Sequence, residues 1–293
     1  MIAGLVLLGG GVAAGLFGSL LGLGGGILIV PLLTLGFGLP LITAVGVSLV
    51  CVIMTSGAAA GVYLERRVAN LRLGMTLELF TAMGALGGAM VAFLLPERLI
   101  EGVFAALLVY TAVTMARRRD PAPAPAGVPG AEAEPDAEPV AAVESDGAAS
   151  AADDIPASDV PFVDTLSGPG YHVHRIGPGI AGSVVAGVAS ALLGIGGGLV
   201  KVPVMHVVMG VPLRVATATS NLMVGITASA SAIIYLLRGG IDAYVAAPTA
   251  IGVFVGASVG SRVAHRIDLR ILRILFVLIL LYTAFEMVQK VLA

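Results

Sequence analysis

The stretch Leu21-Gly22-Leu23-Gly24-Gly25-Gly26 decides the fold, because it occurs a second time as Leu193-Gly194-Ile195-Gly196-Gly197-Gly198. Residues 15–115 align with residues 187–287 without a gap, and 33 of the 101 aligned pairs are identical. Chance does not produce such a register over so long a stretch. The chain therefore contains two copies of one structural unit.

The composition is that of a membrane protein. A hydrophobic content of 58%, a charged content of 12% and a mean hydropathy of +1.02 lie far outside the range of soluble globular domains. A helix needs about 20 mostly apolar residues to cross about 30 Å of hydrocarbon. Segments of this kind are 41–64, 73–95, 176–200, 215–237 and 243–261, with 99–116 and 271–288 as more charged additions. The sequence predicts an all-α polytopic membrane protein.

The glycine run interrupts the first apolar region of each copy. It is followed by a short apolar stretch that ends near Leu39 in the first copy and near Val211 in the second. One full helix and one half helix fit this pattern better than two full spans. Irregular backbone is tolerated at membrane depth only where protein buries it or water lines it. Each repeat is predicted to have a broken, re-entrant first element followed by three transmembrane helices.

Charge divides the chain into three regions, which are predicted to be a first membrane repeat (1–117), a linker (118–175) and a second membrane repeat (176–293). Residues 120–170 carry 11 acidic groups and no Lys or Arg, while the rest of the chain has 16 basic and 7 acidic groups. The linker has few large apolar residues, so it cannot offset the entropy of ordering. It is predicted to be a disordered acidic segment, either a plain tether or a docking site for a partner.

The basic residues predict how the two copies are oriented. If each copy crosses the membrane four times, the loops on the linker's face carry nine basic residues and the other face six. If the broken element returns to the face it entered from, the division becomes 12 against 3, with only Arg98, Arg238 and Lys290 outside. The positive-inside rule favours the second arrangement. This predicts inverted-topology repeats, a cytoplasmic linker and external termini.

The breaks are the candidate substrate site. Inverted repeats with broken helices are typical of secondary transporters that bind their substrate near the midplane. Amides freed at Gly24, Gly25 and Gly26, and at Gly196, Gly197 and Gly198, favour a small anion at the start of each half helix. The alternative is that these glycines only allow helices to pack closely.

Polar side chains near the breaks extend this candidate site. Ser48 and Ser220 occupy matching positions, and Thr219 and Asn221 add further donors beside Ser220. The alternative for Ser and Thr is a hydrogen bond within their own helix. The copies differ here, because Gly46-Val47-Ser48-Leu49 replaces the more polar Ala218-Thr219-Ser220-Asn221.

Glu78, Lys201 and His206 are candidates for proton coupling. Ionisable side chains are costly inside a membrane, so they are functional candidates there. Lys201 follows Gly198 and is also a candidate counter-charge for an anion. The alternatives are that Lys201 reaches the membrane surface, that Glu78 contacts headgroups, and that His206 is interfacial or part of the core.

The repeated glycine segments, each followed by a proline at the same distance, and Ala218-Thr219-Ser220-Asn221 resemble the TauE/SafE sulfite exporter family, also called the 4-toluene sulfonate uptake permease group. The resemblance covers about 15–115 and 180–288. It implies transport of sulfite, thiosulfate, sulfoacetate or another sulfonate across the cytoplasmic (inner) membrane, without identifying the anion.

The predicted function is therefore secondary transport of such anions by alternating access, with a passive anion channel or an intramembrane enzyme as alternatives. The chain has no P-loop, no His-Glu-x-x-His and no Cys-x-x-Cys, so neither an enzyme nor an ATP-driven pump is predicted. The expected partners are the lipid bilayer, a small anion and a coupling proton or sodium ion, with oligomerisation left open. No metal, cofactor or nucleic acid is expected.

Overall fold

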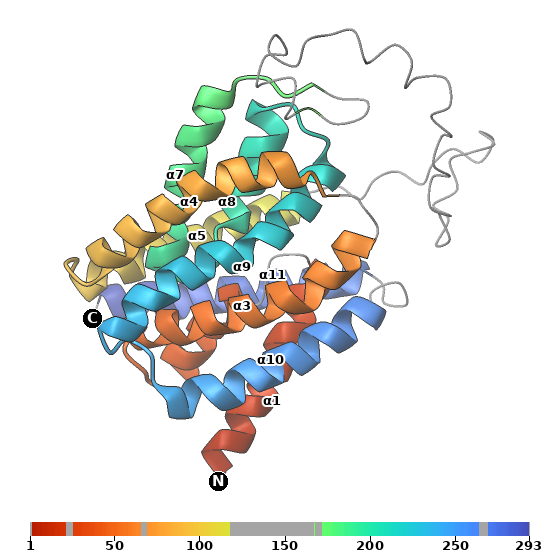
Figure 1. Ribbon diagram of the computed structural model, residues 1–293. Coiled ribbons are helices and arrows are strands. Elements are labelled where there is room, and N and C mark those ends of the chain that lie inside the picture. The colour runs from red at the N-terminus through yellow and green to blue at the C-terminus, as the bar shows by residue number, and fades with distance from the viewer. Residues whose placement is uncertain are drawn as a thin grey trace, which may run out of the picture.

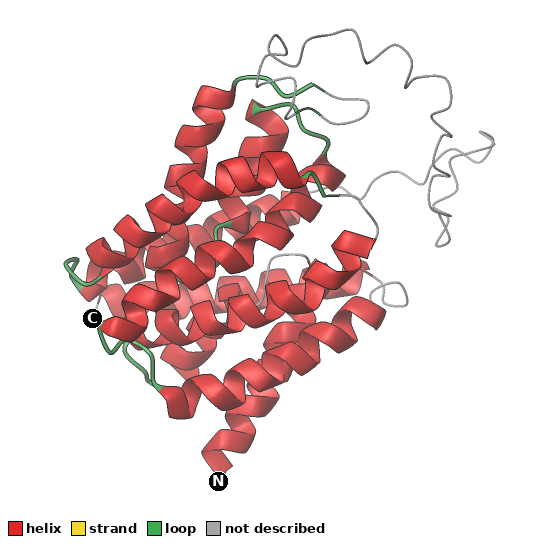
Figure 2. Ribbon diagram, viewed as in Figure 1, coloured by secondary structure: helices red, strands yellow, loops and turns green. Residues whose placement is uncertain are grey.

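The computed structural model describes residues 2–21, 26–65, 69–117, 167, 172–263 and 269–292, and every regular element in that part of the chain is helical (Figures 1 and 2). The first half contains α1 (Ile2–Leu21), α2 (Gly26–Pro31), η1 (Leu32–Gly36), α3 (Leu41–Glu65), α4 (Leu71–Ala92) and α5 (Glu97–Arg117). The second half contains α7 (Ile176–Leu193), α8 (Gly198–Pro203), η2 (Val204–Val208), α9 (Leu213–Leu237), α10 (Ala243–Val263) and α11 (Leu269–Leu292). The predicted all-α fold is confirmed.

Several of these helices can cross a membrane by length and composition. The five candidate spans among the described residues are Leu41–Ala58, Leu71–Ala92, Ile176–Leu193, Val215–Leu237 and Ala243–Gly260. Shorter apolar helices occupy Gly4–Ser19, Gly26–Gly36 and Gly198–Val208. The chain is a multi-pass membrane protein.

The short second element has the same local structure in both halves. Pro31 ends α2 and Pro203 ends α8, and the next turn is the wider π-helix, η1 or η2. Proline has no N–H to donate, which interrupts the α-helical bonding at this point. Each turn closes with the same backbone bond, from Leu39 N to Leu33 O (3.1 Å) and from Val211 N to Met205 O (3.0 Å).

The two halves pack on each other in a reciprocal way (Figure 1). Helix α1 packs on α10, and its counterpart α7 packs on α4, the counterpart of α10. The matched helices α3 and α9 pack together, as do α5 and α11. Every large contact between the halves therefore has its equivalent under exchange of the two repeats.

Glycines bring the outer helices into close contact and reveal their directions. A Cβ atom on Gly252 would lie 2.2 Å from the Leu8 carbonyl oxygen, and one on Gly256 would lie 2.1 Å from that of Val12, so α1 and α10 run parallel. A Cβ atom on Gly84 would lie 2.3 Å from the Val184 carbonyl oxygen, where α4 meets α7. Such contacts between backbones are typical of helix packing in membranes.

The central helices α3 and α9 run antiparallel. Near the start of α3, a Cβ atom on Gly46 would lie 2.3 Å from the carbonyl oxygen of Gly240, just beyond the end of α9. Further along α3, the Ser56 hydroxyl donates to the carbonyl oxygen of Asn221 in the first part of α9 (2.9 Å). Helices that match in sequence therefore point in opposite directions at the centre of the molecule.

The predicted linker lies mostly outside the described residues, namely at 118–166 and 168–171. Its last residues, 172–175, contact the second half. Val173 is buried with 3% of its surface exposed, and His174 N donates to Met209 O (3.0 Å). The packed structure of the second half thus begins slightly before the predicted boundary at 176.

Candidate functional site

The second glycine run forms the predicted break between α7 and α8. Helix α7 ends at Leu193 and α8 begins at Gly198. Between them Gly194, Gly196 and Gly197 have φ values of +67°, +77° and +76°. Residues with a Cβ atom rarely adopt this left-handed conformation, so glycine is needed at all three positions. In the first copy Gly24 and Gly25 lie outside the described residues, and Gly26 begins α2.

Gly26, at the end of the first glycine run, meets the second break beside Ser48 on α3. A Cβ atom on Gly26 would lie only 2.5 Å from the carbonyl oxygen of Gly194. The Ser48 hydroxyl lies 2.7 Å from Gly194 O and 3.2 Å from Gly26 O, and it donates to both carbonyl oxygens. Ser48 therefore ties the two breaks together, and its only proton is already committed to them.

Two hydroxyl groups beside the second break have no partner among the described residues. Ser220 on α9 and Ser190 on α7 are both fully buried, and neither Oγ atom makes a hydrogen bond there. The Ser220 Oγ lies 3.5 Å from the position of a Cβ atom on Gly198, and the Ser190 Cβ lies 3.3 Å from that on Gly197. Both side chains thus border the glycine backbone of the break.

These two hydroxyls differ from other buried hydroxyls of the spans. Ser183 donates to Gly179 O (2.9 Å) and Thr81 to Leu77 O (2.8 Å), which is the usual bond within a helix. A buried polar group without a partner costs about 1–3 kcal/mol. Such a group in a native protein calls for an explanation, and a bound ligand is one.

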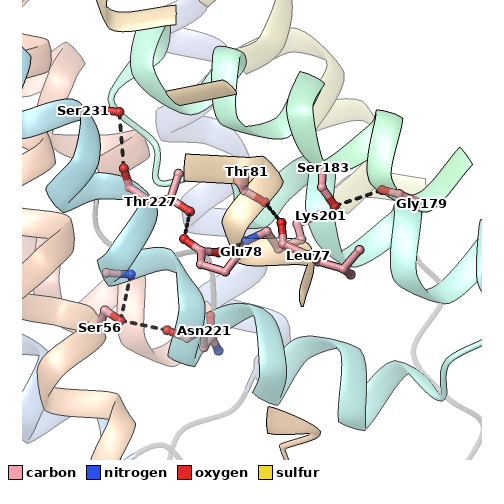
Figure 3. Close-up of polar contacts among 11 residues, drawn as sticks. Ser56, Leu77, Glu78, Thr81, Gly179, Ser183, Lys201, Asn221, Thr227 and Ser231 are labelled. Atoms are coloured by element: carbon pink, nitrogen blue, oxygen red, sulfur yellow. Dashed lines mark hydrogen bonds and ion pairs between the residues drawn. The ribbon is translucent and has the colours of Figure 1, made fainter. Parts of the chain in front are cut away.

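A buried ion pair lies near the second break (Figure 3). Lys201 on α8 donates from Nζ to Oε2 of Glu78 on α4, and the Thr227 hydroxyl on α9 donates to Oε1 of Glu78 (2.5 Å). Only 1% of Lys201 and 4% of Glu78 are exposed. Neither side chain reaches the membrane surface, so the surface alternatives for both residues are wrong.

The remaining predicted residues have other contacts in the structure. Thr219 is buried, and its hydroxyl accepts a bond from Asn70 N (2.9 Å), which holds the start of α4. Asn221 is half-buried and accepts the Ser56 hydroxyl on its backbone oxygen. His206 is exposed on η2, with Nδ1 2.9 Å from Val211 O. It lies outside the Glu78–Lys201 contact.

Two residues of this region were not predicted from the sequence. Ser190 aligns with Gly18, so the alignment of the two repeats does not mark it as a shared polar position. It lies four residues before Gly194. Thr227 aligns with Thr55, and this identity between the repeats could have marked Thr227 as a candidate. Thr55 donates to Val52 O in its own helix (2.9 Å), whereas Thr227 donates to Glu78.

Comparison with known proteins bears on the family of the chain. The family model of the sulfite exporter TauE/SafE matches residues 7–287. The chain belongs to the TauE/SafE family. A Bacillus subtilis (strain 168) protein described as the probable membrane transporter protein YunE is 25% identical over 286 residues, covering 92% of this chain and 93% of its own. No solved structure matches. The TauE/SafE match includes both halves and spans the linker, which confirms the family resemblance seen in the repeats and identifies a membrane transporter.

Proposed function

We propose that this TauE/SafE protein is a secondary transporter that moves small sulfur-containing or organic anions, such as sulfite, thiosulfate, sulfoacetate or another sulfonate, across the cytoplasmic membrane by alternating access. The observation that carries the proposal is the pair of unpartnered, fully buried hydroxyls of Ser190 and Ser220 beside the second glycine break. The family description and the name of the Bacillus relative support transport rather than catalysis.

The chemistry of the site suits an oxyanion. Sulfite and sulfonate groups present several acceptor oxygens, and the Ser190 and Ser220 hydroxyls are donors without other partners among the described residues. The backbone of a glycine break can approach a ligand closely because glycine has no side chain. Lys201 follows Gly197 by one helical turn, with its N bonded to Gly197 O (3.0 Å), and supplies a positive charge close by.

The directions of the helices support inverted repeats. The matched helices α3 and α9 are antiparallel, and a two-fold axis across the helices, in the plane of the membrane, is the simplest relation that produces this. The break at Gly194–Gly198 then enters from one face and the break before Gly26 from the other. In this arrangement the linker is cytoplasmic and the termini are external, as the basic residues predict.

Alternating access follows from the same arrangement. Gly26 touches Gly194, and the halves contact each other through the helix pairs α1–α10, α4–α7, α3–α9 and α5–α11 and through the ion pair. When one half rocks against the other, the region between the breaks opens to one face of the membrane and closes to the other. We expect the substrate to bind on the second-half side of that contact, because Ser48 on the first-half side is already hydrogen-bonded.

Ligand stabilisation and counterflow test the proposal. Purified protein is screened for a rise in Tm with sulfite, thiosulfate, sulfate, methanesulfonate, sulfoacetate and short carboxylates, since a ligand of the native state raises Tm by mass action. Anions that stabilise the protein are then tested for counterflow in proteoliposomes. Saturable counterflow, in which internal unlabelled anion accelerates uptake of label, separates a carrier from a passive channel.

Two alanine variants and a matched control locate the site. Ser190→Ala and Ser220→Ala are expected to lose most of the anion-induced rise in Tm and most of the counterflow. Ser183→Ala is the control, because Ser183 is equally buried on the same helix as Ser190 but bonds to Gly179 O. Unchanged counterflow of every transported anion in both Ser190→Ala and Ser220→Ala would show that the site is assigned wrongly.

A further inference from the structure

The Glu78–Lys201 pair joins the two halves at a position that has no equivalent in the repeat. Glu78 belongs to the first half and Lys201 to the second. Their aligned positions are the apolar residues Ala250 and Ile29. Two charges buried in a membrane protein are costly, and a packed apolar pair of similar size is often at least as stable. The equivalent positions in the other repeat pack without charges. The packing of the fold therefore does not require this ion pair.

The Lys201 ammonium has hydrogen-bond donors that its contact with Glu78 does not use. Both carboxylate oxygens of Glu78 are occupied, Oε1 by Thr227 and Oε2 by Lys201. The Lys201 ammonium has three N–H donors, and its contact with Glu78 uses one of them. Within the described residues no other acceptor is paired with Nζ. The ammonium can therefore accept an anion if Glu78 gives up its negative charge.

Lys201 lies within reach of the proposed anion site. On α9, Ser220 and Thr227 are seven residues apart and thus lie on the same face, separated by about 10 Å along the helix axis. Lys201 contacts Glu78 at the Thr227 end, and its backbone lies one turn after Gly197 at the break. Its four-carbon chain can turn the ammonium from Glu78 toward an anion at Ser220.

Charge balance decides what has to accompany the anion. With Lys201 charged and Glu78 ionised, the buried site is neutral. An entering monovalent anion would alone make it negative, and a proton on Glu78 would alone make it positive. Either unpaired charge is strongly unfavourable at this depth, whereas both together keep the site neutral.

From these contacts we infer that Glu78 and Lys201 couple the transported anion to one proton. An anion binds the Lys201 ammonium, the Lys201–Glu78 contact breaks, and Glu78 takes one proton from water on the open side. Thr227 holds the Glu78 carboxyl group during the exchange. Release of the anion on the other side returns the proton to water and re-forms the contact. This inference rests on the proposed function and identifies its coupling ion as a proton.

Other titratable groups are poorly placed for this role. Helix α7, which packs against both α4 and α8, contains none. On α4 itself Arg72 is exposed, and on η2 His206 is exposed and bonded to Val211 O. On α9 the Tyr235 hydroxyl donates to Ala191 O (2.9 Å), and Arg214 precedes Thr227 by 13 residues, or about 20 Å of helix.

Proteoliposomes distinguish the coupling from the transport itself. Methanesulfonate and ethanesulfonate, both labelled and both monovalent, are the probes, and the membrane potential is clamped at zero. Counterflow is measured without a pH gradient, and net accumulation is measured with the outside one pH unit more acidic than the inside. For one proton per anion we expect up to about tenfold accumulation of the label. An internal pH indicator should report one proton entering per anion.

The Glu78→Gln variant mimics the protonated carboxyl group permanently. It is expected to carry out counterflow at an altered rate but to show no accumulation driven by the pH gradient. Glu101→Gln is the matched control, because Glu101 also pairs with a lysine (Lys290, 2.5 Å) but Lys290 is 43% exposed. It should retain both activities.

A second measurement makes the test independent of the variant's folding. Adding either probe to weakly buffered wild-type protein should raise the pH by the uptake of one proton per bound anion. Wild-type protein with counterflow but neither accumulation nor proton uptake would overturn the coupling and leave the transporter intact. Accumulation driven by the pH gradient in Glu78→Gln or in Glu78→Gln/Lys201→Met would also overturn the coupling. Wild-type protein that neither binds nor exchanges any anion of the screen above refutes the proposed function, and the coupling proposal falls with it.

Discussion

Substituting Gly26 by alanine tests whether contact between the two breaks matters to the protein. The added Cβ atom would lie 2.5 Å from the Gly194 carbonyl oxygen, whereas ordinary contacts begin at 3.4 Å, so the breaks must separate by 0.9 Å. Gly26 is part of helix α2, so the effect comes from this contact and not from a left-handed backbone. A shift of 0.9 Å along the Ser48–Gly194 bond would lengthen it from 2.7 to 3.6 Å, which is no longer a hydrogen bond.

The free energy of unfolding should fall by about 1–3 kcal/mol for the overpacked contact and by about 1 kcal/mol for the lost hydrogen bond. For a chain of this size each kcal/mol lowers Tm by roughly 2–4 °C, which thermal unfolding in detergent resolves. Counterflow should fall as well, because the breaks no longer meet. Gly57→Ala is the control, since Gly57 lies within α3 with no atom within 4 Å of an added Cβ. Equal Tm and counterflow in the two variants would refute the reasoning.

Two further predictions concern stability alone. Ser220→Ala removes a buried hydroxyl that has no partner among the described residues, so its Tm should equal or exceed that of the wild type. Ser48→Ala removes the hydrogen bonds to Gly194 O and Gly26 O and should lower the free energy of unfolding by about 1–3 kcal/mol. A higher Tm for Ser48→Ala than for Ser220→Ala would contradict this. Lys201→Met leaves Glu78 buried without its counter-charge and should cost about 3–5 kcal/mol, while Glu78→Gln/Lys201→Met should be closer to the wild type in Tm. A double variant less stable than Lys201→Met would contradict that account.

The sequence was sufficient to predict the features that depend on nearby residues. Three glycines in a row and a proline five residues later specify the break and the short helix after it, because positive φ values and a missing N–H are local properties. The gapless repeat then extends the same prediction to the other half. The antiparallel course of α3 and α9 agrees with the orientation that the basic residues favour, although the arginine count only indicated it.

The ion pair depends on packing that a single sequence does not reveal. Glu78 and Lys201 are 123 residues apart and meet only because α4 of one half lies against α7 and α9 of the other. Neither has a charged counterpart in the repeat, so aligning the halves gives no hint of the contact. Each was recognised as a candidate from its cost in a membrane, but as separate groups.

The direction of neighbouring side chains was equally hidden. Thr219 and Ser220 are adjacent and were assigned to the same site, yet successive residues on an α-helix point about 100° apart. Thr219 faces the start of α4 and bonds to Asn70, whereas Ser220 faces Gly198. Only the positions of the neighbouring helices decide which of the two borders the break.

Building the ion pair into the other half tests the proposed two-fold relation directly. Ile29 aligns with Lys201 and Ala250 with Glu78, both are buried at 0% and 4% exposure, and Thr55 already stands in the position of Thr227. If the halves are equivalent, Ile29→Lys and Ala250→Glu place their charges against each other. Each single variant should then lose about 3–5 kcal/mol as an unpaired buried charge, and the double variant should recover about 0.5–3 kcal/mol of their sum. Tm values for the four proteins of this cycle measure the recovery, with Ile29→Lys/Ala247→Glu, one turn away on α10, as the control pair. Strictly additive losses in both pairs would mean that these positions do not face each other, because two opposite charges in contact inside a membrane cannot be energetically independent.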